Sequence, residues 1–362
     1  MIDYATFVSE VNKRKTLVDN YLFDDRNRIK FNYTHLEDAV YSYLRAGGKA
    51  LRSAVMMFCC GAVGGDETSA LPAAAAIELY HTFTLVHDDI IDRDELRRGV
   101  PTVHAEFTRR AKSDLGFDDR IASHYGLTIA ILAGDMQQGW AASLLPDLYL
   151  TYGVPAEVAL NLVHELFNKT QVTLINGQTV DVTQAQTPFD QLAEADVLEM
   201  LRQKTGVLYE FAGRAGAAIG LREPDLQHPT VEAVATFTSK CGVAFQIQDD
   251  LLDITGDTSR IGKTVGADIR EGKRTLIVLH GLRHMSEEQR STALQVLGNS
   301  SATDEQIQNL VGTLREVGSV DYAENLAKQY VNEGLAELAV LPDSAYKQLL
   351  ITWASYMISR DK

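Results

Sequence analysis

Two short acidic motifs have the residue types and spacing best suited to chemistry in this sequence. Both read D-D-x-x-D: the first runs from Asp88 to Asp92, and the second from Asp249 to Asp253. In a helix, side chains four positions apart project side by side, so each motif offers a pair of carboxylates. Like charges at this spacing repel one another, and more strongly if they are buried. The pairs therefore indicate a bound cation.

Magnesium is the cation that fits these carboxylates, because it prefers hard oxygen ligands and bridges carboxylates to substrate phosphates. One such motif alone would more simply be a solvated acidic helix end. Two motifs, each after an apolar helical stretch, predict carboxylates on two helices of a bundle that face each other across a cavity. The sequence therefore predicts a magnesium site for a phosphorylated substrate.

Two groups of cationic residues could bind the phosphates. Lys49 and Arg52 lie near a predicted helix start, beside two glycines that allow close backbone approach. Arg97 and Arg98 follow the first acidic motif, where a glycine and a proline end the helix. An arginine fork can bind a diphosphate through two hydrogen bonds at once. Taken alone, Lys49 and Arg52 would more simply be a solvated pair, and Arg97 and Arg98 could be a surface ion-pair cluster.

Apolar residues recur mostly at helical spacing, which predicts an all-α fold. The clearest helices are predicted at about 72–92, with Pro72 in the first turn, and at 229–253. Other helices are predicted at about 36–60, 127–145, 156–180, 192–219, 274–297 and 304–360, the last in several pieces. Thr303 and Gln306 predict a capping box at one helix start.

Two segments are predicted to be loops. The polar stretch from Arg109 to His124, of mixed charge, is interpreted as an extended loop or insertion between helices. The segment 256–274 contains four glycines among Lys and Asp residues, which indicates a mobile loop.

Composition and length predict one globular domain over residues 1–362. Hydrophobic residues make up 45% of the chain and charged residues 23%, and no Pro-rich or Gly/Ser-rich linker interrupts it. A net charge of −15 argues against a nucleic-acid partner. No apolar run reaches the roughly 20 residues of a membrane span, and the N-terminus lacks a signal-peptide pattern, so a cytoplasmic location is expected. The three cysteines are expected to be reduced and buried.

The whole pattern resembles the trans-type polyprenyl diphosphate synthases, which include the farnesyl and geranylgeranyl diphosphate synthases. The matching residues, in the family's order, are Gly47-Gly48-Lys49 with Arg52, Asp88-Asp89-x-x-Asp92 with Arg97-Arg98-Gly99-x-Pro101-Thr102, Lys204-Thr205, Phe245-Gln246-x-Gln248-Asp249-Asp250-x-x-Asp253, Gly262-Lys263 and Lys273-Arg274-Thr275. The resemblance implies an isoprenoid-synthase-type helical bundle around a deep central cavity, usually a homodimer. It also implies three magnesium ions and a reaction that joins isopentenyl diphosphate to an allylic diphosphate such as dimethylallyl, geranyl or farnesyl diphosphate.

The resemblance also assigns roles to matching positions. Two magnesium ions would be bound by the first motif, through Asp88 and Asp92 with Asp89 beside them, and the third by Asp249 and Asp253. The residues implied to hold the allylic diphosphate are Arg97, Lys204, Gln246, Lys263 and Lys273, and Thr205 is implied to be substrate-binding as well. Those implied to hold isopentenyl diphosphate are Lys49, Arg52, His81 and Arg98. The catalytic set is implied to be Asp88, Asp92, Arg97, Lys204, Asp249 and Lys263.

His81 and the 177–181 segment add two weaker signals. His81 lies seven residues before Asp88, two turns away on the same helix face. A lone helical histidine is usually structural, and only this register and the resemblance favour a ligand role. Gln178 and Asp181 match the family's G-Q-x-x-D pattern and are implied to line the cavity near the reacting carbons, although a polar helix end would look the same.

Product length is implied by the residues before the first motif. In this family, positions four and five before the first Asp help to set the depth available to the product, and here they are Thr84 and Phe83. This combination resembles synthases of twenty-carbon geranylgeranyl diphosphate, with fifteen-carbon farnesyl diphosphate as the alternative. On a helical wheel, Thr84 lies near the face of Asp88, whereas Phe83 is turned well away from it, so Phe83 could instead be core packing.

In the implied mechanism, carbon–oxygen cleavage leaves diphosphate and an allylic cation, and the double bond of isopentenyl diphosphate attacks that cation. Magnesium and cationic side chains stabilise the leaving group, so no protein nucleophile is needed. The 256–274 loop, with Lys263 and Lys273, is expected to close over the site and exclude water.

Three other functions remain open. A terpene cyclase would have a mixed second motif with Ser or Thr and Glu in place of the full D-D-x-x-D seen here. A metal phosphohydrolase with a His87-Asp88 dyad would need further histidine ligands, for which His104 and His124 are the nearest candidates. A non-catalytic synthase subunit should have lost an acidic motif, and both are intact.

Overall fold

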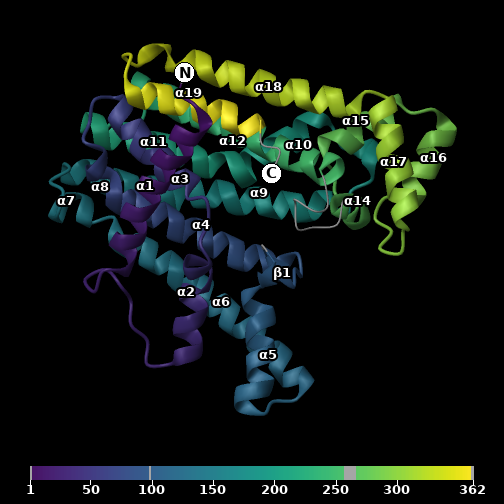
Figure 1. Cartoon of the computed structure of the whole chain (residues 1–362), viewed down its shortest axis with the longest axis horizontal. Coiled ribbons are helices and arrows are strands. Elements are labelled where there is room, and N and C mark those ends of the chain that lie inside the picture. The colour runs from purple at the N-terminus through teal and green to yellow at the C-terminus, as the bar shows by residue number, and fades with distance from the viewer. Residues whose placement is uncertain (1, 98, 257–265, 360–362) are drawn as a thin grey trace. The chain divides into compact units, whose positions relative to one another are not determined.

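The structure, a computed structural model, describes residues 2–97, 99–256 and 266–359. Arg98, Gly262 and Lys263, together with the central part of the predicted 256–274 loop, lie outside these residues. The described part is helical almost throughout, with one two-residue hairpin as its only paired strands. The prediction of an all-α fold is therefore confirmed (Figure 1).

Contacts between residues group the helices into two compact units. The N-terminal unit consists of residues 5–163 and 215–226, and the C-terminal unit of residues 1–4, 164–214 and 227–362. The chain crosses from one unit to the other within α11 (Val207–Leu221). One domain over 1–362 stays a prediction, and each unit is described by itself below.

The N-terminal unit is built around α4 (Leu71–Ile91) and α6 (Asp119–Leu144), which pack against each other. Its other elements, in chain order, are α1 (Tyr4–Phe23), α2 (Thr34–Ala46), α3 (Leu51–Ala62), the short 3-10 helix Glu67–Ala70, β1 (Leu96–Arg97), β2 (Val100–Pro101), α5 (Val103–Leu115), α7 (Asp147–Leu150) and α8 (Ala156–His164). The predicted helix at 72–92 matches α4, and Pro72 lies in its first turn. Helix α1 was not predicted. It buries Phe7, Val11, Val18 and Leu22, which lie four or seven residues apart.

The helix predicted at 36–60 is in fact two helices, α2 and α3. Between them, Gly47 has a φ of +76° and Ala50 a φ of +48°, both in the left-handed region. A glycine adopts this conformation without strain, whereas an alanine there costs about 1–2 kcal/mol. The break places a helix start at Leu51, beside Lys49 and Arg52, as the glycines indicated.

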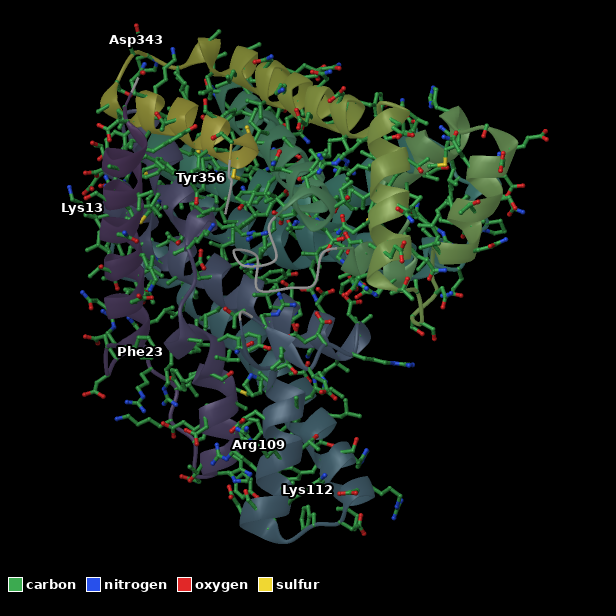
Figure 2. All side chains as sticks on the ribbon, turned by 45° about the vertical axis from the view of Figure 1, so that its right-hand side comes forward. Lys13, Phe23, Arg109, Lys112, Asp343 and Tyr356 are labelled. Carbon is green, nitrogen blue, oxygen red and sulfur yellow. The ribbon has the colours of Figure 1, made fainter. Side chains whose placement is uncertain are left out.

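The loop predicted from Arg109 to His124 is wrong, because α5 and α6 fill almost all of this segment. Gly116 ends α5 with a φ of +70°, and the chain turns directly into α6, which packs against α5. Arg109 and Lys112 lie on α5 (Figure 2). Charged residues of this kind gave the segment the polar sequence pattern from which a loop was predicted.

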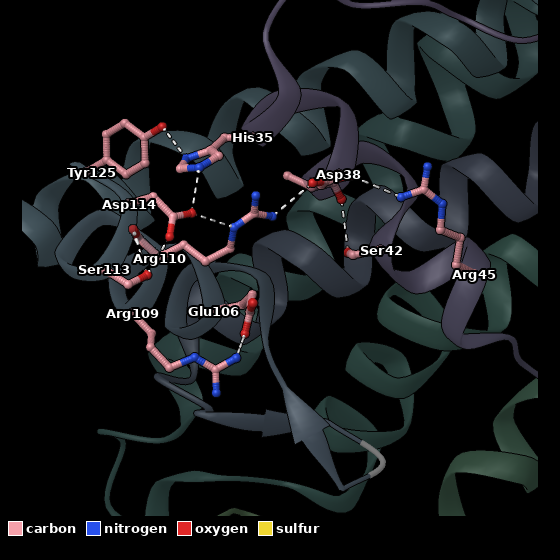
Figure 3. Close-up of polar contacts among 11 residues, drawn as sticks. His35, Asp38, Ser42, Arg45, Glu106, Arg109, Arg110, Ser113, Asp114 and Tyr125 are labelled. Carbon is pink, nitrogen blue, oxygen red and sulfur yellow. Dashed lines mark hydrogen bonds and ion pairs between the residues drawn. The ribbon is translucent and has the colours of Figure 1, made fainter.

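Ion pairs join this helical hairpin to α2 within the N-terminal unit (Figure 3). Arg110 donates to Asp38 at 3.0 Å and to Asp114 at 3.3 Å, and His35 lies between Asp114 and the Tyr125 hydroxyl. His35 is 8% exposed and also contacts the ring of Phe107, so the network is partly buried. The polar residues of the segment therefore hold helices together.

The C-terminal unit is centred on α12 (Pro229–Thr255), which has α18 (Ser319–Glu337) and α19 (Ala345–Ile358) packed along it (Figure 1). The remaining elements are the π-helix Glu165–Thr170, α9 (Gln171–Gln184), the 3-10 helix Phe189–Gln191, α10 (Glu194–Leu201), the π-helix η4 (Arg202–Gly206), α14 (Ala267–Glu271), α15 (Leu276–His284), α16 (Glu287–Val296), α17 (Asp304–Glu316) and the 3-10 helix Leu338–Val340. Trp353 of α19 contacts the rings of Tyr209 and Phe237, both at 5.5 Å between centroids, and these rings are fully buried. Aromatic packing thus forms the centre of this unit.

Several finer predictions can be compared with these elements. The capping box of Thr303 and Gln306 is present at the start of α17, and the helix predicted at 274–297 is two helices, α15 and α16. The three cysteines are buried and reduced, as expected, and burial raises the pKa of Cys60 to about 12. In the described part of the chain, no helix is both long and apolar enough to cross a membrane.

Gly126 gives a stability test of the α5–α6 packing. A Cβ at this position would lie under 3.0 Å from Thr108 Oγ1 and the His104 carbonyl oxygen, whereas one at Gly139 of the same helix meets no atom within 4 Å. We expect Gly126→Ala to lower the free energy of unfolding by about 1–3 kcal/mol, because backbone atoms cannot easily yield. Gly139→Ala is the control and should be neutral or stabilising. Chemical denaturation measures both, and equal stabilities would contradict the packing described.

Candidate functional site

The first acidic motif lies at the C-terminal end of α4, in the N-terminal unit. Asp88 is in the last turn and is partly exposed, whereas Asp92, which caps the helix, is exposed. The Asp92 backbone N–H donates to the Asp88 carbonyl oxygen at 2.8 Å, so the helical spacing of the two residues is kept. These two carboxylates are accessible at a helix end, where the chain carries no cation of its own in the last turn.

Asp89 has a different environment from its two neighbours. Its side chain is fully buried and accepts hydrogen bonds from Arg97 Nε at 2.7 Å and from the Tyr43 hydroxyl. Burial and the Asp89 carboxylate raise the pKa of Tyr43, and that carboxylate raises the pKa of Arg97 against the opposing effect of burial. Asp89 therefore anchors an arginine and a tyrosine, and the prediction that it is a metal ligand stays untested.

A tight turn brings Arg97 back to this position. Helix α4 ends with Arg93 in the left-handed region, at a φ of +59°, and Gly99 turns the β1–β2 hairpin with a φ of +78°. The Thr102 hydroxyl donates to the Asp94 carbonyl oxygen at 2.7 Å and closes the hairpin. The expectation that the chain after the motif leaves a guanidinium near its carboxylates is confirmed for Arg97.

Arg52 of α3 and His81 of α4 are in contact within the N-terminal unit. Arg52 Nη1 lies 3.1 Å from His81 Nε2, and since a guanidinium only donates, Nε2 accepts and the His81 proton is on Nδ1. Lys49 is exposed and lies two residues before the start of α3 at Leu51. Two of the residues predicted to bind isopentenyl diphosphate are thus in contact.

Glu78 was not predicted, and it supports this pair. One of its carboxylate oxygens accepts the Ser53 backbone N–H at 3.1 Å, and so caps α3, whose N-cap residue Ala50 has no side chain able to do so. Burial raises the pKa of Glu78, and hydrogen bonding by Ser53 and then the charge of Arg52 oppose that rise. One N–H at the start of α3 is therefore already bonded to a carboxylate.

The two residues implied to limit product length differ in their surroundings. Phe83 is 7% exposed and packs between the rings of Tyr80 and His87. Thr84 is partly exposed, and its hydroxyl donates to the His81 carbonyl oxygen at 2.7 Å. The helical-wheel prediction that Phe83 is turned away from the Asp88 face agrees with this packing.

The second acidic motif lies near the C-terminal end of α12, in the C-terminal unit. Asp249, Asp250 and Asp253 are all partly exposed. Gln246, one turn earlier, donates to Asp250 at 3.2 Å and accepts from the Thr205 hydroxyl at 3.1 Å. The predicted Thr205 and Gln246 are therefore brought together beside this motif.

Lys204 is presented by a local widening of the helix. Residues Arg202–Gly206 form a π-helical turn, a feature often found at functional sites. Lys204 Nζ donates to Asp181 at 2.6 Å. A Cβ at Gly177 would lie 2.5 Å from the Lys204 backbone nitrogen, so this glycine allows α9 to approach the π-helix. The G-Q-x-x-D segment thus holds Lys204 in place through its Gly and its Asp.

Asp253 connects α12 to the segment after residue 265. Its side chain accepts the Asp268 backbone N–H at 3.1 Å, and its carbonyl oxygen accepts the Gly266 N–H at 2.9 Å. Lys273 Nζ pairs with Asp268 at 2.9 Å and with Glu271 at 3.2 Å. Burial lowers the pKa of Lys273, but the two carboxylates raise it by more. The net pKa is therefore raised, and the lysine stays charged. The described end of the predicted loop is therefore a short helix bonded to the motif.

The carboxylates of the two motifs are of a type that fits magnesium. Among residues 2–97, 99–256 and 266–359, no group of three or more acidic, His or Cys side chains is assembled as a complete metal site. Each motif instead offers hard oxygen donors that leave coordination positions for water and phosphate, as magnesium prefers. Burial is the main cause that holds the pKa of Asp250 well above its usual range, and the charges of Asp268 and Asp249 add to it. The donor set is thus chemically suited to the ion.

Tyr43, Glu78 and Asp268 are the site residues that sequence reasoning missed. Tyr43 reaches Asp89 from 46 residues away, and Glu78 reaches Ser53 from 25 residues away. No local pattern reveals such pairs. Asp268 had a usable signal, because it lies among the glycines and lysines of the segment already singled out.

Comparisons with known proteins agree with this geometry. A family model described as polyprenyl synthetase matches residues 33–314. A geranylgeranyl diphosphate synthase of Methanosarcina mazei is 36% identical over 356 residues, which cover 98% of both chains.

Solved structures give the same result. The geranylgeranyl pyrophosphate synthetase of Pyrococcus horikoshii aligns with a TM-score of 0.84 and 31% identity over 99% of both chains. A geranylgeranyl pyrophosphate synthase of Corynebacterium glutamicum, complexed with isoprenyl diphosphate and magnesium, aligns with a TM-score of 0.80 and 28% identity over 99% of this chain and 100% of the other.

Asp89 and Asp92 should differ in what they contribute. We expect Asp89→Ala to lower the free energy of unfolding by about 2–4 kcal/mol, because Arg97 loses its buried partner. Asp92→Ala should leave the stability unchanged but weaken magnesium-dependent diphosphate binding. Thermal denaturation and calorimetric titration with magnesium and inorganic diphosphate measure the two effects. Equal stabilities of the two variants would contradict the anchoring role of Asp89.

Proposed function

The chain belongs to the polyprenyl synthetase family, and we propose that this prenyltransferase condenses isopentenyl diphosphate with an allylic diphosphate to make a short trans-polyprenyl diphosphate. The main product we propose is geranylgeranyl diphosphate. The observation that carries the proposal is the pair of D-D-x-x-D motifs, each at a helix end and each with cations that neighbouring acids hold in position. The names of the relatives support the twenty-carbon product.

The first motif and its surroundings supply one set of roles. Asp88 and Asp92 would hold magnesium, for which their exposure at the end of α4 is suitable. Arg97 would bind the allylic diphosphate, and its guanidinium is held by Asp89, which also accepts a hydrogen bond from Tyr43. The residues proposed to bind isopentenyl diphosphate are Lys49, Arg52, His81 and Arg98.

The second motif and its surroundings supply the other set. Asp249 and Asp253 would hold a further magnesium ion, for a total of three. The residues proposed to bind the allylic diphosphate are Lys204, Thr205, Gln246, Lys263 and Lys273. Each of these side chains already has a partner in the C-terminal unit: Lys204 pairs with Asp181 of α9, Gln246 with Asp250 of α12, and Lys273 with Asp268 of α14.

These residues would favour heterolysis of the allylic carbon–oxygen bond. When bound, magnesium neutralises charge on the diphosphate. The guanidinium and ammonium groups donate hydrogen bonds to the departing oxygens, where negative charge grows, and such preorganised donors are the main source of electrostatic catalysis. The double bond of isopentenyl diphosphate attacks the allylic cation, a carbon–carbon bond forms, and a proton leaves to the released diphosphate.

Association and location are proposed alongside the reaction. We propose a homodimer, in line with the family resemblance. Val172, Ile175 and Val182 expose about half of their surfaces along α9, at helical spacing, as an interface would require. Light scattering of the purified chain measures its mass directly. A cytoplasmic location also stays a prediction.

An elongation assay tests the reaction. The purified chain is incubated with magnesium, isopentenyl diphosphate and dimethylallyl, geranyl or farnesyl diphosphate in turn, and the products are sized by mass spectrometry. We expect a ladder that ends at twenty carbons and that disappears when a chelator removes magnesium.

Other outcomes of this assay would point to the other functions. An end at fifteen carbons would keep the reaction but reject the product length. A cyclic hydrocarbon would indicate a terpene cyclase, and release of phosphate without elongation a phosphohydrolase. Activity from the single purified chain would dismiss a non-catalytic subunit.

Lys204 gives a sharper test of the site. Because it is proposed to bind the departing diphosphate, we expect Lys204→Ala to lower kcat by about 100-fold and to raise the KM for the allylic substrate, while the KM for isopentenyl diphosphate changes little. Lys328→Ala is a matched control, since Lys328 is exposed on α18. Equal losses for both substrates would contradict the assignment.

A further inference from the structure

We propose that His87 and Gly134 are specificity-determining residues, which set product length by fixing the position of the Phe83 ring. This inference rests on the proposed function and deepens it. Neither residue would touch the diphosphates. His87 would act through Phe83, and Gly134 would act by making room for His87, so both are positioning residues.

Three aromatic side chains of α4 form a stripe on one face of the helix. Tyr80, Phe83 and His87 follow one another at steps of three and four, the spacing of helix neighbours. The Tyr80 and Phe83 rings meet edge to face, with centroids 4.8 Å apart and planes at 90°. Phe83 and His87 meet in the same way, at 5.5 Å and 87°. The Phe83 ring is therefore held from both sides along the helix.

The His87 ring is held in turn by α6. His87 Nε2 lies 3.2 Å from the Ile131 carbonyl oxygen, and because a carbonyl only accepts, Nε2 carries the proton. One turn along α6, a Cβ added at Gly134 would lie under 3.0 Å from three atoms of the His87 ring, namely Nε2, Cδ2 and Cε1. Because Gly134 has no side chain, the His87 imidazole can pack against α6 at this point.

The atoms that a Cβ at Gly134 would meet all belong to one flexible side chain. At Gly126, by contrast, a Cβ would also meet backbone atoms of α5, namely the His104 carbonyl oxygen and the Thr108 nitrogen. An alanine at 134 should therefore displace the His87 ring and leave the two helices packed together. Displacement of that ring removes one of the two edge contacts on Phe83.

This coupling explains how Phe83 could matter despite its orientation. Phe83 is 7% exposed and lies away from the Asp88 face. If its ring limits the growing chain, as the family resemblance implies, that limit depends on where its two edge contacts hold the ring. If a ring can occupy two positions, one edge-to-face contact made in only one of them changes the ratio of the two populations by about 2- to 10-fold. Loss of the His87 contact should therefore let the ring turn aside in a fraction of molecules, and the product should lengthen.

Substitutions at His87 separate the effect of the ring from that of the hydrogen bond. His87→Ala removes both the ring and the bond to Ile131, His87→Gln keeps a donor but no ring, and His87→Phe keeps a ring but no donor. We expect products at least one five-carbon unit longer than those of the wild type to increase about fivefold in the Ala and Gln variants. The Phe variant should retain the wild-type distribution.

A pair of alanine substitutions on α6 tests the role of Gly134. Gly134→Ala should lengthen the products in the same way, because it displaces His87. Gly139→Ala changes the same residue type on the same helix, but its Cβ meets no atom within 4 Å, so its products should match those of the wild type. Thermal denaturation of each variant checks that it is folded before its products are compared.

The outcomes distinguish this inference from the proposed function. If the wild type elongates but the His87→Ala, His87→Gln and Gly134→Ala variants all give its product distribution, the inference is overturned, even if their rates fall. A shift in His87→Phe as large as in His87→Ala would also overturn it, because the ring would then not matter. If the wild type elongates nothing, the proposed function itself fails.

Discussion

The arrangement of this protein depends on how an acidic chain keeps cations available for an anionic substrate. With a net charge of −15, carboxylates outnumber cations in this chain. Several of the cationic side chains proposed to bind diphosphate each have one or two defined carboxylate partners. Asp89 pairs with Arg97, Asp181 with Lys204, and Asp268 and Glu271 with Lys273. These partners fix the direction of each cation, and they raise the pKa of Arg97 and Lys273, so less conformational entropy is lost when a diphosphate binds.

The same arrangement separates the acidic residues by role. Within the first motif, the middle position is buried and bonded, whereas Asp88 and Asp92 stay accessible at the end of α4. A D-D-x-x-D motif is therefore more than a row of equivalent carboxylates. Its spacing of four puts two side chains on one exposed face, and the remaining Asp points toward the helices packed behind. That division explains why a single helix end can both bind cations and anchor a guanidinium.

Glycines determine how closely the helices around these residues approach. Gly126 allows α5 to pack on α6, Gly177 allows α9 to reach the π-helix that presents Lys204, and Gly134 gives His87 its place against α6. In each case, atoms from a neighbouring helix occupy the space that a side chain would fill. Small residues in such positions act on chemistry indirectly, because a shift of one ring or one backbone turn changes where a functional group lies.

The sequence by itself determined the helical class, the two acidic motifs, most of the cations and the family, because these depend on residue type and on spacing within one helix. It misplaced the 109–124 segment, since charges that pair between α2 and α5 and between α5 and α6 look like solvent-exposed charges in a linear pattern. It also could not foresee Tyr43, Glu78 or the contact of Gly134 with His87. Only the tertiary structure decided these, because each joins residues that are distant in sequence, and no local periodicity records which helices will meet.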